Sequence, residues 1–182
     1  DSSSGIQWIL APKGIVDPSV WSEYQAVAQQ TNCIIREGKG LAERVAAELP
    51  YGCPYGDRRP IKSAIGTDRE RFACPYDRSV PGTIECRGPR PVQRLRGPVV
   101  INLHAQWELG KPRQFNRIPC PEVYGEDSEE NRLKWFIACL EKIARRRGPD
   151  AFTSIAFPYK IGCRMAGGDW KLYFKAIEAF TK

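Results

Sequence analysis

PVVINLHAQW, residues 98–107, is the stretch that decides the fold class of this chain. Its apolar residues run almost without interruption, as they do in strands that are covered on both faces. Strands of that kind belong in largely parallel sheets with helices packed against both sides. The stretch therefore predicts an α/β domain with a buried central strand, around which the other segments can be arranged.

Strand-like and helix-like segments alternate along the rest of the chain. Further strands are expected at 5–10, 24–32, 82–87 and 153–161. Helices are expected at 38–49 and at 128–147, where Asp127 and Glu130 have capping-box spacing. The apolar side of a last helix carries Trp170, Phe174, Ile177 and Phe180. This alternation predicts a three-layer α-β-α fold with a mixed, largely parallel sheet.

Length, charge and cysteine content bound the function. The 182 residues fit one domain, spanning 1–182, with residues 1–4 expected to be disordered or the remnant of a trimmed boundary. No signal peptide or membrane-spanning run is evident, and the seven cysteines form no CxxC pair. We therefore expect an intracellular protein of cytoplasm or nucleus, without disulfides, metal or cofactor. The net charge of +7 favours an anionic partner.

Two strand-to-helix junctions are rich in glycine, QQTNCIIREGKGLAER at 29–44 and KIGCRMAGGDWKL at 160–172. The carboxyl ends of parallel strands meet at one edge of a sheet, where ligands bind in α/β folds. Glycines there let a ligand approach the backbone, and the first turn of a helix attracts phosphate oxygens. A tight turn explains either loop equally well. The pair of loops indicates a phosphate-binding edge and leaves the ligand open.

The chain resembles the macrodomains, which are ADP-ribose-binding α/β modules. Within them it is most similar to the branch of ADP-ribose 1″-phosphate phosphatases and ADP-ribosyl-ester hydrolases. The resemblance is carried, in the family's order, by QQTNC, GKGLAERVAAELP with Tyr51 and Tyr55, VVINLHAQ with GKP at 110–112, RLKWFIACLEKI and AFPYKIGCRMAGGDW. These pieces span most of the chain from about residue 24 onward.

The resemblance implies that ADP-ribose, free or on a macromolecule, is the partner. It places Asn32 near the distal ribose, with the loop Gly38, Lys39 and Gly40 beside it. It also implies that a second loop wraps the diphosphate. That loop consists of Gly162, Cys163, Arg164, Met165, Ala166, Gly167 and Gly168. The activity that it implies is hydrolysis of a bond at the distal ribose, with a non-catalytic ADP-ribose reader as the alternative.

The chain departs from the family where catalysis is concerned. APKGIVDP replaces the usual GD motif, so Asp17 is the nearest acid to the adenine position. Gln29 stands where the phosphatase-like members have histidine, Ala166 where the hydrolases have aspartate, and Arg164 where glycine is usual. These changes favour the reader over the enzyme.

Two candidate catalytic residues remain. Asp169, at the end of the second loop, is either the cap of the last helix or a group that acts on the distal ribose. His104, the one histidine, is either a packed residue of the buried strand or a general base.

A third interpretation is a basic module that binds nucleic acid. It depends on RGPRPVQRLRG at 87–97, with Arg87, Arg90, Arg94 and Arg96, and on Arg145, Arg146 and Arg147. The first stretch has prolines rather than aromatic residues between its arginines, so it lacks a stacking platform. A solvated loop and the negative end of a helix explain the two clusters as well.

Overall fold

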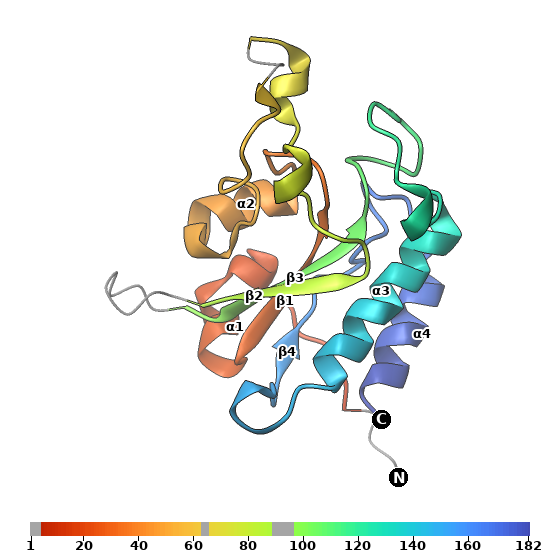
Figure 1. Ribbon diagram of the computed structural model, residues 1–182. Helices are drawn as coiled ribbons and strands as arrows, with labels where there is room; N and C mark the ends of the chain where they lie inside the picture. The colour runs from red at the N-terminus through yellow and green to blue at the C-terminus, as the bar shows by residue number, and fades with distance from the viewer. Residues whose placement is uncertain (1–4, 63–65, 89–96) are drawn as a thin grey trace.

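A mixed four-stranded sheet lies at the centre of the computed structural model, which describes residues 5–62, 66–88 and 97–182 (Figure 1). Its strands are β1 (Ala26–Asn32), β2 (Thr83–Arg87), β3 (Val99–Gln106) and β4 (Ile155–Ala156), in the order β2-β3-β1-β4. β1 runs parallel to β3 and β4, and only β2 is antiparallel, to β3. The predicted α/β class with a largely parallel sheet is confirmed.

Four α-helices surround this sheet: α1 (Pro18–Glu23), α2 (Leu41–Glu48), α3 (Glu129–Ala144) and α4 (Trp170–Phe180). Short 3-10 turns occur at Gly14–Val16, Pro50–Gly52, Asp68–Arg71, Pro75–Asp77, Glu122–Tyr124 and Gly148–Asp150. In Figure 1, α3 and α4 lie side by side on one face of the sheet, and α1 and α2 lie across from them.

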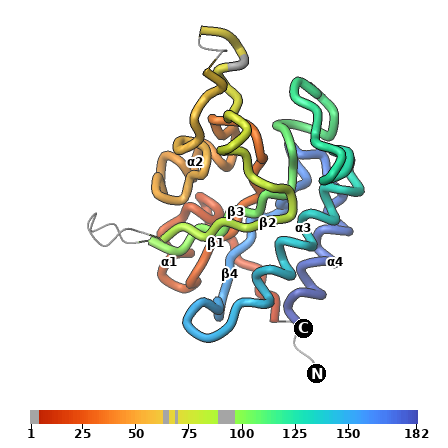
Figure 2. Tube along the Cα trace, in the orientation of Figure 1, coloured from red at the N-terminus to blue at the C-terminus, as the bar shows by residue number. Residues whose placement is uncertain are grey.

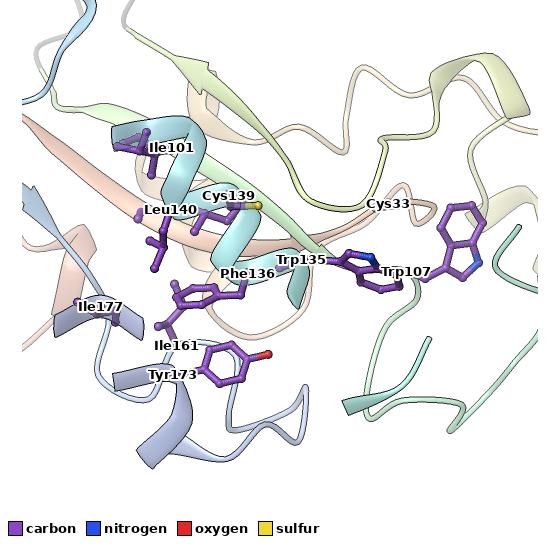
Figure 3. Close-up of a cluster of buried hydrophobic side chains, with 14 of the residues drawn as sticks. Cys33, Ile101, Trp107, Trp135, Phe136, Cys139, Leu140, Ile161, Tyr173 and Ile177 are labelled. Atoms are coloured by element: carbon purple, nitrogen blue, oxygen red, sulfur yellow. The ribbon is translucent and has the colours of Figure 1, made fainter. Parts of the chain in front are cut away.

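Alternate residues of the central strands feed two hydrophobic cores, one on each face. Ala26 and Ala28 of β1 pack with α3 and α4, whereas Val27 packs with α1 and α2. Figure 3 shows the larger core, where the rings of Phe136 on α3 and Tyr173 on α4 face each other with centroids 4.6 Å apart. This two-sided burial is why β1 begins with three consecutive apolar residues and why β3 is mostly apolar.

The predicted strand at 5–10 is wrong, and the predicted strand at 153–161 is much shorter than expected. Residues 6–10 form no regular element, because their backbone bonds to no other described segment. β4 ends after two residues, since Pro158 and the turn that follows leave the direction of the sheet. A strand requires a bonded neighbour, and a cleft separates residues 5–11 from β4.

Two helices begin later than their sequence pattern predicts. α2 starts after Gly40, whose φ of 60° and ψ of −119° are not helical. α3 starts after Ser128, whose hydroxyl accepts the Asn131 N–H at 3.1 Å. Asp127 is therefore not the cap that the sequence predicts; its carboxylate pairs with the guanidinium of Arg132 instead.

Candidate functional site

The two glycine-rich junctions meet at one edge of the sheet. Gly38, Lys39 and Gly40 follow β1 and lead into α2, and residues 162–168 follow β4 and lead into α4. β1 and β4 are parallel neighbours, so their carboxyl ends point the same way. A Cβ atom at Gly40 would lie 3.0 Å from Met165 Sδ, so the loops are in contact. The structure thus brings the two predicted loops together.

Packing inside the second loop requires its glycines. A Cβ atom at Gly162, where φ is +72°, would lie 2.5 Å from Tyr173 Cε1 and 2.6 Å from Gln30 Oε1. One at Gly168 would lie 2.7 Å from Gly162 O, and Gly168 N–H donates to that same oxygen. These glycines close the loop over the Tyr173 ring. The outward part of the loop is Arg164 and Met165, whose side chains are exposed.

Arg132 of α3 holds the second loop in place through hydrogen bonds. Its buried guanidinium donates to both carboxylate oxygens of Asp127, at 2.6 and 2.7 Å. It also donates to the backbone oxygens of Glu108 at 3.1 Å, Gly110 at 2.6 Å and Ala166 at 3.2 Å. One side chain therefore ties the loop after β3 to the loop after β4.

Sequence reasoning missed Arg132, although a signal for it existed. Phe136, Cys139 and Ile143 follow it at helical spacing on the buried face of α3. An arginine on the apolar face of a helix, five residues after an aspartate, indicates a buried ion pair. Ala166 in the second loop is also buried, and its backbone carbonyl accepts a hydrogen bond from Arg132.

Asn32, predicted near a ribose, is buried at the end of β1. Its Oδ1 accepts the N–H groups of Ile34 at 3.2 Å and Ile35 at 2.8 Å, and its Nδ2 donates to the Tyr55 hydroxyl at 3.3 Å. Burial raises the pKa of Tyr55 to about 12, so this phenol stays protonated. The side chain of Asn32 therefore holds the turn after β1, the structural role that loop-capping asparagines commonly take.

His104, the candidate general base, lies inside the sheet. Its Nδ1 is 2.8 Å from Thr31 Oγ1, and its Nε2 is 3.8 Å from Glu85 Oε2. Burial, with the nearby charges of Arg58 and Arg87, lowers the pKa of His104 to about 3. The imidazole is consequently neutral near pH 7 and a weak base, which favours the structural interpretation over catalysis.

Asp169, the second catalytic candidate, is the N-cap of α4. Its Oδ1 accepts the Lys171 N–H at 2.9 Å. Cys163 lies beside it, and its thiol donates to Ile161 O at 3.2 Å. Burial, with the charge of Asp169, raises the pKa of Cys163 to about 11, so the thiol is protonated and poorly nucleophilic near pH 7. Neither group is placed as an activated nucleophile or base.

The other residues singled out from the sequence also have structural partners. Asp17 caps α1 by accepting Ser19 N–H at 3.0 Å. Gln29 is buried and donates to Asn102 Oδ1 at 2.8 Å. Both side chains therefore serve the fold.

Three cations lie on the segments that meet here. Lys39 and Arg164 are exposed on the two loops, and the stem of Lys111 packs on Gly167. Among the described residues, no carboxylate forms an ion pair with any of the three, whereas Arg113 nearby is paired with Glu126. The N-terminus of α4, an eleven-residue helix, lies at the end of the second loop. The carboxylate of Asp169 caps that N-terminus, so the positive charge of this edge comes from the three side chains.

The basic segments on which the nucleic-acid interpretation depends have other partners where they are described. Arg87 pairs with Glu85 and Asp57 at 2.7 Å each. Arg146 donates to Asp150 O, and Arg147 to Ala144 O, at the end of α3. Arg90, Arg94 and Arg96 lie outside the described residues.

Comparison with known proteins adds no family name. No protein-family model matches the chain, and no curated protein matches it. The resemblance to macrodomains therefore stays a prediction. Across residues 5–62, 66–88 and 97–182, no helix has both the length and the apolar character needed to cross a membrane.

Proposed function

We propose that this chain binds ADP-ribose or an ADP-ribosyl group at the edge where loops 38–40 and 162–168 meet. The observation that carries the proposal is that Lys39, Lys111 and Arg164 lie on the segments that meet there. None of the three has an ion-pair partner among the described residues. A diphosphate is the anion suited to such a cluster, because its oxygens can accept from backbone N–H groups and side-chain cations together. Resemblance alone supplies the ADP-ribose part of the ligand.

Binding without turnover is the form of this function that the geometry supports best. Hydrolysis at the distal ribose needs a carboxylate or base free to activate water. Asp169 is used as a helix cap, and His104 is buried and neutral. We therefore assign the chain as a reader of ADP-ribose, and hydrolysis becomes an outcome of the test.

Calorimetric titration of ADP-ribose, with AMP and ribose 5-phosphate as controls, tests this assignment. We expect ADP-ribose to bind much more tightly than either control, because neither control carries the diphosphate. Arg164→Ala should weaken binding about tenfold, the loss expected for one charge-assisted contact. Lys175→Ala, which removes an exposed cation elsewhere on α4, is the matched control and should leave the affinity unchanged.

Equal affinity for AMP and ADP-ribose, or no binding at all, would contradict the assignment. Turnover is measured on the same samples by release of ADP-ribose from an ADP-ribosylated carrier protein. Release that is lost in Asp169→Asn, with the helix content of the variant intact, would make the chain a hydrolase rather than a reader.

A further inference from the structure

A cleft of about 910 Å³ separates β4 from the N-terminal segment 5–11. Its lining includes Phe152, Ile155, Phe174 and Phe180, and Arg164 is the only charged residue among the described residues that line it. Figure 2 shows the segment that precedes α1 passing beside α4. Trp8 in this segment packs on Phe174, with ring centroids 5.3 Å apart. The cleft is thus apolar and lies at an edge of the sheet.

One wall of the cleft is the outer edge of β4. In the parallel register with β1, Ala26 N–H donates to Ser154 O, and Ala26 lies opposite Ile155. Successive residues of a strand direct their backbone groups to opposite neighbours. The N–H and C=O of Ile155, and the N–H of Phe157, therefore point away from β1. Both residues line the cleft, and no described residue bonds to these groups.

The opposite wall of the cleft, segment 5–11, also has backbone groups without hydrogen-bond partners among the described residues. Residues 6–10 form no backbone hydrogen bond with any described residue. Leu10 is 100% exposed and Trp8 is 63% exposed, so this segment presents apolar side chains at the surface. The cleft therefore combines exposed apolar side chains with unpaired backbone groups on two sides.

We propose that this cleft receives an extended peptide segment of a partner protein, which adds to β4 as a further strand of the sheet. A strand offers the two things that the walls lack, a row of backbone N–H and C=O groups and alternating side chains that can be apolar. A helix bonds its own backbone, and a small apolar molecule has no such groups. The occupant is accordingly a segment of strand length with apolar residues at every second position.

The probe for this proposal is a blocked peptide of about six residues, a usual strand length, that alternates valine with threonine. Its control carries proline at each threonine position, which removes half of the N–H donors. On the unaltered chain, the first peptide should slow amide hydrogen exchange at Ile155 and Phe157 and raise the unfolding temperature. The amide of Ala156 should be unaffected, because it already points toward β1. The proline peptide should do neither.

An Ile155→Pro variant sharpens the result, since it removes a donor that faces the cleft and leaves the groups that face β1 in place. It should bind the valine–threonine peptide about tenfold more weakly, the effect of about 1.4 kcal/mol. Circular dichroism establishes whether the variant folds; if it does not, the two peptides on the unaltered chain still decide. Equal binding of both peptides, unchanged exchange at Ile155 and Phe157, or dimerisation of the chain through this edge would overturn the proposal.

Discussion

Two edges of this sheet reverse the usual distribution of polar and apolar groups. They are the loop edge, where loops 38–40 and 162–168 meet, and the cleft edge, where β4 faces segment 5–11. At the loop edge, charged and polar side chains such as Arg132, Asp127 and Asn32 are buried, and each is hydrogen-bonded. At the cleft edge, Trp8 and Leu10 are exposed beside unpaired backbone. Buried polar groups cost stability unless they are paired, so the first arrangement has a single favourable geometry. The second arrangement lacks a partner, which is why we assign the loop edge to a preformed site and the cleft edge to docking.

The largest expected effect comes from Arg132→Met. Removing the guanidinium leaves the carboxylate of Asp127 buried without its partner, together with the backbone oxygens of Glu108, Gly110 and Ala166. We expect a loss of about 3–5 kcal/mol in the free energy of unfolding, measured by urea denaturation. Leu10→Ser at the cleft edge is the contrasting variant and should change that free energy by less than about 0.5 kcal/mol.

Adding Asp127→Asn to Arg132→Met should recover part of the loss, because it removes the unpaired charge. The comparison between the two edges would fail if Leu10→Ser were as destabilising as Arg132→Met. That result would mean that the apolar residues of segment 5–11 hold the fold together.

A smaller effect is expected from Gly162→Ala, which tests why the second loop contains glycine. A methyl group there would collide with the ring of Tyr173, and the backbone φ of +72° disfavours any other residue. Gly148→Ala is a matched control, because Gly148 has a φ of +59° and no atom within 4 Å of the added methyl group. We expect a loss of about 1 kcal/mol for the control and about 1–3 kcal/mol more for Gly162→Ala, by denaturant unfolding. Equal losses would remove the packing role assigned to this glycine.

The smallest effect is a pH dependence caused by His104. Its pKa is about 3 in the folded chain and about 6.5 when unfolded, so between these values the unfolded state binds the additional proton. The stability that it contributes is present above pH 6.5 and is lost as the pH falls toward 3. The slope approaches about 1.4 kcal/mol per pH unit, so the free energy of unfolding should fall by about 1.6 kcal/mol between pH 6.5 and 5. His104→Gln removes the only histidine of the chain and should flatten this dependence.

Urea denaturation at pH 7, 6 and 5 measures the difference between the two chains. A variant with the same slope as the unaltered chain would show that other groups carry the pH dependence and that His104 is not buried neutral at the loop edge.

The central part of the fold could be predicted because its signals are local. The mostly apolar run at 98–107 and the strand ending at Asn32 indicated buried parallel strands, and β3 and β1 lie where they were expected. Glycines after two strands indicated a common edge, because the carboxyl ends of parallel strands meet there. The convergence of loops 38–40 and 162–168 follows from that rule. The ligand did not follow from it and was supplied by resemblance.

What only the tertiary structure decided concerns partners that lie far apart in the sequence. GIQWIL at 5–10 has the composition of a strand. It forms no strand, because its backbone has no hydrogen-bonded neighbour among the described residues. The glycines of the second loop read as ligand-facing, yet two of them are required by the ring of Tyr173. Arg132 could be placed on the buried face of α3, whereas its five acceptors come from residues brought together only by folding. Periodicity and turn chemistry act over a few residues, while pairing and burial depend on which segments meet in space.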